Sequence, residues 1–138
     1  MIWDGTTRTI GDLKWPPQNL DRFGRLIVTS LRDNGIKHFD GLANSHWKAP
    51  SLQNLQADLA KLTDEQKAVV RRCIIQCLDN ALHDFLFALV EANDFDKGIA
   101  LVVDGKNLAE ISDGLHSEPS TDEGWIAKFS EFSNTSEP

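Results

Sequence analysis

Residues 63–91 carry the periodicity of one long helix, and this pattern constrains the fold more than any other part of the chain. Thr63 and Gln66 form a capping box, in which the threonine hydroxyl accepts from the backbone N–H of Gln66 and the glutamine side chain reaches back. We therefore expect a helix over 64–91. Residues 85–90 would be apolar on all its sides, so that segment must be covered by the rest of the fold or by another subunit.

The pattern changes to strand-like spacing after residue 93. Asp104-Gly105 is a favoured two-residue turn between β-prone runs, which predicts a hairpin over 99–111. The sequence thus predicts an α+β fold that is mainly helical, with a long central helix and a C-terminal β-hairpin packed on helices. The other elements expected from apolar spacing and turn residues are a helix over 17–33 that ends at Asn34-Gly35, a loop over 35–50, a short helix over 52–61 and a terminal helix over 122–132.

Length predicts how these elements are grouped. The chain has 138 residues, which is enough for one domain with a single sizeable core. We expect that domain to span residues 1–132, with an irregular N-terminal arm over 1–15 and a disordered tail over 133–138.

Composition narrows the class of protein. A formal net charge of −7 disfavours nucleic-acid binding, because phosphate contacts need clustered Lys and Arg. No uncharged apolar run reaches about 18 residues, so we expect no membrane span, and residues 1–5 lack the pattern of a signal peptide. Cys73 and Cys77 lie four apart on the long helix and are expected to be free, buried core thiols, which suits a reducing cytoplasm.

The charges are divided unevenly along the chain. Residues 1–75 hold 11 basic and 8 acidic side chains, whereas residues 76–138 hold 3 basic and 13 acidic ones. This asymmetry could steer a protein partner with a basic surface to the C-terminal half, or it could simply form a solvated acidic surface.

Several short motifs of the C-terminal third resemble a family of small bacterial proteins of uncharacterised function. The resemblance covers about residues 78–132 and implies a bacterial source and an α+β domain. It implies no activity, so it assigns no site residues. The motifs that carry it are the run from Ala81 to Phe87, Val103-Asp104-Gly105, the run from Ser112 to His116, and Gly124-Trp125-Ile126.

Two groups of polar residues could carry chemistry. Asp79 and His83 share a face of the long helix, where they could bind a metal or act as a base and its orienter, or form an ordinary surface pair. Residues 112–118 gather carboxylates, a histidine and hydroxyls in one loop beside the hairpin. If His83 lay close to Asp113 and His116, the three would form a hydrolase-like or metal-dependent site.

A bland interpretation explains the same loop. A turn capped by Asp113 and Ser117 needs these residue types without any function. Asp79 and Glu118 are further ligand-binding candidates. The chain has no nucleophile elbow and no phosphate-binding glycine loop, so we predict no cofactor, no resident metal and no assigned catalytic residue, and leave open whether it is an enzyme.

The leading hypothesis is therefore a small non-catalytic protein-binding or regulatory module, acidic, cytoplasmic and homodimeric. The apolar segment 85–90 and the edges of the hairpin both need covering, and a two-fold interface would cover both copies at once. Trp3, Trp15 and Phe87 are the predicted partner-binding residues, since tryptophan is enriched at binding hot spots. The alternative is a hydrolase-like, metal-dependent or ligand-binding protein that uses His83, Asp113 and His116.

Overall fold

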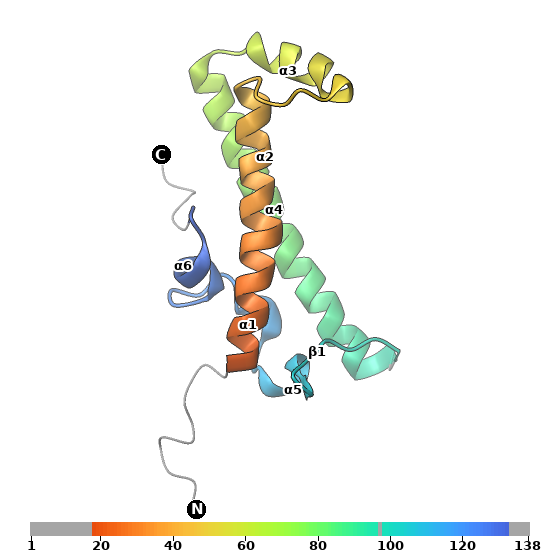
Figure 1. Cartoon of the computed structure of the whole chain (residues 1–138). Coiled ribbons are helices and arrows are strands. Elements are labelled where there is room, and N and C mark those ends of the chain that lie inside the picture. Colours follow the sequence, from red (N-terminus) through yellow and green to blue (C-terminus); the bar gives the residue numbers. More distant parts are fainter. Residues whose placement is uncertain (1–17, 97, 133–138) are drawn as a thin grey trace, which may run out of the picture.

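Two long helices that pack against each other form the body of the protein (Figure 1). The structure, a computed structural model, describes residues 18–96 and 98–132. The first long helix is continuous from α1 (Gln18–Ile27) through the π-helical turn η2 (Val28–Asp33) into α2 (Asn34–Ala43). The second is α4 (Asp64–Glu91), and it continues into a π-helical turn, η4 (Ala92–Asp96).

The predicted end of the first helix at residue 33 is wrong. Asn34 and Gly35 are helical, and the expected loop over 35–50 is helical as far as Ala43. Gly35 does not end the helix and instead allows it to pack closely against α4. A Cβ atom at this position would lie 3.0 Å from the Leu78 side chain of α4. The glycine therefore allows the two helices to approach closely.

The π-helical turn changes which side chains of the first helix face α4. The apolar spacing of Phe23 and Ile27 predicts Leu31 as the next core residue, but Leu31 is 47% exposed. Arg32 and Asp33 are each 1% exposed instead. A π-helical turn holds one more residue than an α-helical turn, so the residues after it are rotated relative to regular spacing.

The short helix and the long helix form where the sequence predicts them. The 3₁₀ turn η3 (Pro50–Leu52) leads into α3 (Gln53–Ala60), which lies across one end of the helix pair (Figure 1). The predicted capping box is confirmed: Gln66 N donates to Thr63 Oγ1 at 3.1 Å, and Thr63 N donates to Gln66 Oε1 at 2.9 Å. These bonds satisfy two backbone donors and fix the start of α4.

The C-terminal segment is less regular than its sequence predicts. The hairpin has two strands of two residues, β1 (Val102–Val103) and β2 (Lys106–Asn107), and Val103 pairs with Lys106 across the predicted turn. The predicted second strand stops there because Asn107 caps a helical turn, its side chain accepting from Ala109 N at 3.0 Å. The remaining elements are α5 (Leu108–Ile111), the 3₁₀ turn η5 (Leu115–Ser117) and α6 (Trp125–Phe129), which is shorter than the predicted helix over 122–132.

Two hydrophobic clusters lie at opposite ends of α4. One joins α1 and the C-terminal half of α4 to the C-terminal segment, with Trp125 1% exposed and Leu86 and Leu108 fully buried. The other joins α2, α3 and the N-terminal half of α4, around Phe39 and Leu59. The mainly helical α+β fold class is confirmed, with the hairpin packed on the helices as expected. The arm over 1–15, with Trp3 and Trp15, and the tail over 133–138 lie outside the described residues.

Candidate functional site

Of the three residues that would form a site if they lay close together, the structure brings two into contact. His83 lies on α4 and His116 on η5, and their rings meet edge to face with centroids 5.2 Å apart. Phe87, one helical turn after His83, meets the same His116 ring at 5.2 Å. Nδ1 of His116 is buried and makes no hydrogen bond within the described part of the chain. The pair therefore joins the turn η5 to α4 through ring contacts.

The third residue does not join the pair. Asp113 is exposed, and its carboxylate makes no hydrogen bond or ion pair with the residues that the structure describes. The acidic neighbour of His83 is instead Asp84, whose Oδ1 lies 3.2 Å from His83 Nδ1. Asn80, one helical turn before Asp84, donates to the other oxygen of Asp84 at 3.1 Å.

The two ligand-binding candidates are occupied by structural contacts. Asp79 accepts from Arg32 Nε at 2.5 Å. Glu118 accepts from Ser112 Oγ at 2.7 Å, and the same hydroxyl accepts from Gly114 N at 3.2 Å. The loop is thus a turn, as the bland interpretation holds, although Ser112 caps it in place of Asp113 and Ser117.

These contacts limit the chemistry of the histidine pair. Among residues 18–96 and 98–132 no three His, Cys, Asp or Glu side chains are grouped so that they could hold a metal ion. Two histidines with one exposed carboxylate supply a proton acceptor and a weak ligand pair.

Arg32 forms a charged cluster that the sequence did not predict. Besides Asp79 on α4, its guanidinium donates to Ser130 Oγ at 2.9 Å and to the backbone oxygen of Phe132 at 3.2 Å. Asp33 accepts from Ser130 Oγ at 2.6 Å and from Glu131 N at 2.9 Å. The cluster fastens the chain after α6 to both long helices. The role of this cluster is structural, since every contact described for it lies within the fold.

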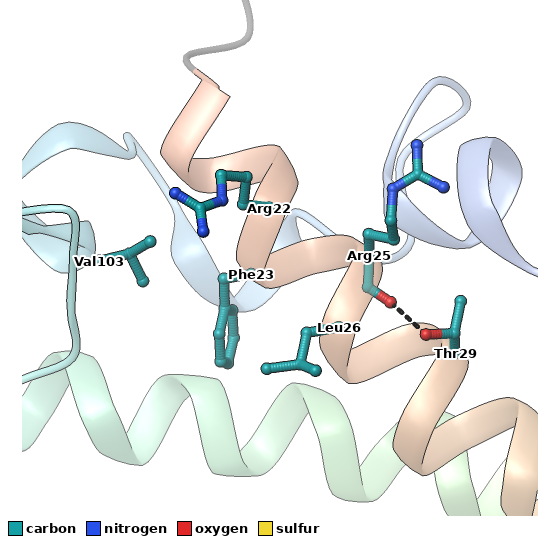
Figure 2. A pocket seen from close by; sticks show the side chains of 6 residues that line it. All are labelled: Arg22, Phe23, Arg25, Leu26, Thr29 and Val103. Atoms are coloured by element: carbon teal, nitrogen blue, oxygen red, sulfur yellow. Dashed lines mark hydrogen bonds between the residues drawn. The ribbon is translucent and has the colours of Figure 1, made fainter.

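An open pocket of about 430 Å³ lies between α1 and the hairpin. Phe23, Leu26 and Val103 give it apolar walls, and Figure 2 shows Phe23 and Leu26 pointing towards α4. Arg22 pairs with Asp104, and the Arg25 guanidinium lies 4.5 Å from the Phe129 ring centroid, turned away from the pocket (Figure 2). The two arginines therefore do not converge to bind an anion there.

The side of α4 that faces away from the first long helix is largely exposed, and η5 packs against its C-terminal half through His83 and Phe87. Val69 and Phe85 of α4 are 48% and 54% exposed. Cys73 and Cys77 are free, as expected, but exposed, so their assignment to the core is wrong. The sequence could not show this, because cysteine suits a core position and an apolar interface equally well. Phe87 is 42% exposed, and Leu86 is the fully buried member of the segment 85–90.

The exposure of this helix is unusual for its composition. The stretch Asp64–Phe95 is the one helix among the described residues that is long and apolar enough to cross a membrane, with a mean hydropathy of 1.4 over its most apolar 18 residues. Only 17% of that window is buried. One such helix is weak evidence for a span, and within it Asp79 is ion-paired to Arg32 and Asp84 is hydrogen-bonded to Asn80.

A shallow pocket of about 420 Å³ lies along the middle turns of α4. It is lined by Cys73, Gln76 and Cys77 together with neighbouring side chains of the same helix. Comparison with known proteins adds no relative: no protein-family model, no curated protein and no solved structure matches this chain.

Proposed function

We propose that this chain is a small non-catalytic binding module of bacterial origin, which works in the cytoplasm and holds another protein on the exposed side of α4. One observation carries the proposal: a helix with the hydropathy of a core helix has only 17% of its most apolar window buried. Removing apolar surface from water contributes roughly 25 cal/mol for each Å², so this side gains by being covered. Exposed apolar patches rimmed by polar residues mark interaction sites.

Charge supports a partner with a basic surface. Asp84, Glu91 and Asp94 are exposed on the C-terminal part of the long helix and its extension, and residues 78–91 contain no Lys or Arg. Complementary charge at the rim of an interface favours encounter and fixes orientation. The net charge of −7 disfavours nucleic acid as the partner, and the carboxylates within α4 disfavour a lipid bilayer.

The two cysteines offer a direct test, because both lie on the proposed surface. Purified dilute protein and cells that produce the chain are treated with the same maleimide, and the labelling of Cys73 and Cys77 is followed by mass spectrometry. We expect slower labelling in cells, because a bound protein covers both thiols. Urea-unfolded protein gives the reference rate. Equal labelling rates in cells and in dilute solution would reject the proposal.

A second candidate function is a small metal-dependent, hydrolase-like or ligand-binding protein centred on His83 and His116. The edge-to-face contact of the two rings favours it, whereas the position of Asp113 does not. Calorimetric titration with Zn²⁺ tests it. Binding of one equivalent that His83→Asn and His116→Asn both abolish would support this function, and the absence of binding would exclude its metal-dependent form.

A further inference from the structure

We propose that Cys73 and Cys77 form a binding site for one soft, two-coordinate metal cation, with Cu(I) as the cation of this class that cells contain. This inference goes beyond the proposed function. The two residues are the only cysteines of the chain, and both are free and exposed on α4. Both also line the same shallow pocket of about 420 Å³. One turn of the helix therefore offers two thiols to a single ligand.

The spacing of the two thiols fits a bridging cation better than a disulfide. Residues four apart on a helix have their Cβ atoms roughly 5–6 Å from each other. A disulfide needs Cβ atoms roughly 3.5–4.5 Å apart, so the helix would have to distort to form one. A metal–thiolate bond is roughly 2.3 Å long, so a cation in line between two sulfurs holds them about 4.6 Å apart. Rotation about χ1 of each cysteine allows that separation without movement of the backbone.

The number of ligands selects the cation. Thiolates favour Cu(I), Zn²⁺ and iron–sulfur clusters. Structural zinc takes four ligands and an iron–sulfur cluster takes four cysteines. This chain has two cysteines, and the part that the structure describes groups no three His, Cys, Asp or Glu side chains that could hold a metal. Cu(I) is a closed-shell ion that is satisfied by two thiolates in line, so the pair suits Cu(I) and not zinc or a cluster.

The charges at the pocket favour the complex. Binding exchanges two thiol protons for one cation, so that Cu⁺ and two R–SH give Cu(SR)₂⁻ and two H⁺ without any change in oxidation state. The complex carries one net negative charge, and Arg72 of the same pocket supplies a positive one. Asp79 also lines the pocket, but it is ion-paired with Arg32, so its charge is compensated within the fold.

Anaerobic titration with Cu(I), supplied as its coloured bicinchoninate complex, tests the site. We expect the reduced full-length chain to withdraw one equivalent of Cu(I) and to gain the ultraviolet charge-transfer absorption of a copper thiolate. Cys73→Ser and Cys77→Ser should each bind roughly 100-fold more weakly or worse, because the second bond of a two-thiol site forms intramolecularly and a single thiol lacks it. Both positions are exposed, so the circular dichroism of these variants should stay unchanged.

The double variant Cys77→Ala, Ala81→Cys is the matched control for spacing. It keeps two exposed thiols on α4 but places them two turns apart. Residues 73 and 81 are separated by about 12 Å along the helix, a distance that one cation cannot bridge. We therefore expect this variant to bind Cu(I) as weakly as the single-cysteine variants. An affinity equal to that of the wild type would overturn the site, because any two thiols would then suffice.

The stoichiometry tests whether both thiols come from one chain. In dilute solution we expect one Cu(I) for each chain and a mass by light scattering that stays at 15.4 kDa. One Cu(I) for two chains, with a doubled mass, would overturn the inference, because the cation would then join thiols of two copies.

The single-cysteine variants separate this inference from the proposed function. A bound protein protects the remaining thiol of Cys73→Ser from maleimide in cells, whereas chelation by two thiols does not. If the purified wild type takes up no Cu(I) and that remaining thiol is protected in cells, this inference fails and the proposed function stands. If the wild type takes up one Cu(I) and the thiol of Cys73→Ser reacts equally fast in cells and in dilute solution, the proposed function fails and this inference stands.

Discussion

Arg32 shows how one buried charge can organise a small helical protein. Its side chain is 1% exposed and is surrounded by Asp33, Asp79 and the hydroxyl of Ser130. Charges at such depth are retained only when paired and hydrogen-bonded, because their transfer from water is costly. The partners come from both long helices and from the segment after α6, so one side chain connects three parts of the fold.

Replacing Arg32 should destabilise the protein severely. Arg32→Met leaves the buried carboxylate of Asp33 without its cation, and we expect the free energy of unfolding to fall by about 3–5 kcal/mol. Arg22→Met is the matched control, since Arg22 on the same helix pairs with an exposed Asp104. That exposed pair should contribute less than about 1 kcal/mol. Urea unfolding followed by circular dichroism measures both, and similar losses in the two variants would contradict the assignment.

Two glycines of the first helix should respond unequally to alanine. A Cβ atom at Gly24 would lie 2.4 Å from the Trp125 ring, which is buried and cannot move away. We expect Gly24→Ala to destabilise the fold by about 1–3 kcal/mol. At Gly35 the nearest atom is the end of the flexible Leu78 side chain, at 3.0 Å. Gly35→Ala also gains helix propensity, so thermal unfolding should show a small change of either sign.

At the scale of elements, the sequence predicted best what local chemistry determines. The bounds of α4 follow from apolar spacing and from the Thr63 capping box, both of which are local. The end of the first helix was missed because Asn34-Gly35 is a termination signal that tertiary packing overrides, through the approach of Leu78. The hairpin was predicted too long because the helix cap at Asn107 competes with pairing of the second strand. Strand propensity alone does not show which of these two conformations is more stable.

The capping box should contribute measurably to α4. Thr63→Ala removes the acceptor for Gln66 N, and we expect a loss of about 1 kcal/mol in the free energy of unfolding. Thr29→Ala is the control of the same chemistry: its hydroxyl donates to the Arg25 backbone oxygen within the helix, a bond that does not cap an end. That variant should be neutral or slightly more stable. Equal losses in guanidinium unfolding would argue against the cap.

The ion pair of Lys37 with Glu131 should give α2 a pH-dependent contact. The hydrogen bond to Glu131, opposed by slight desolvation, raises the pKa of Lys37 above its ordinary value of 10.5. A raised pKa means that the stabilisation is fully present below the unfolded value and is lost as the pH rises through the folded value. The stability difference between the wild type and Lys37→Met should therefore stay constant up to about pH 10 and shrink as the pH rises above 10.5. Glu131→Gln should show the same trend in denaturant unfolding, and a difference independent of pH would contradict it.

At the scale of the whole molecule, the sequence predicted part of the site. It named His83 and His116 as residues that would form a site if they lay close together, and the structure brings their rings into contact. It could not place Asp113, because a loop side chain follows the turn geometry that Ser112 and Glu118 set. Nor could it show which side of α4 stays open, since that depends on how the other helices pack.

The mass in solution should depend on concentration. We expect light scattering to show 15.4 kDa in dilute solution and a rise towards twice that mass on concentration. Ala81→Glu should abolish the rise without changing the circular dichroism, because Ala81 is exposed and glutamate is a good helix former. Leu55→Glu, at an apolar position on α3 that is 47% exposed, is the control and should still associate. A constant mass in the wild type would contradict the dimer.

The extra residue in the turn η2 also bears on how such a chain could arise. A turn that holds one residue too many is what a single-codon insertion into a helical hairpin leaves behind. Without it, Leu31 would stand where Arg32 stands, and the apolar stripe of the first helix would run on uninterrupted. The two long helices of such a chain could pack through apolar contacts alone, and in more than one register. The inserted residue turns Arg32 inward, towards the carboxylate of Asp79 on the opposite helix. Only one register of the two helices then pairs the arginine with a carboxylate.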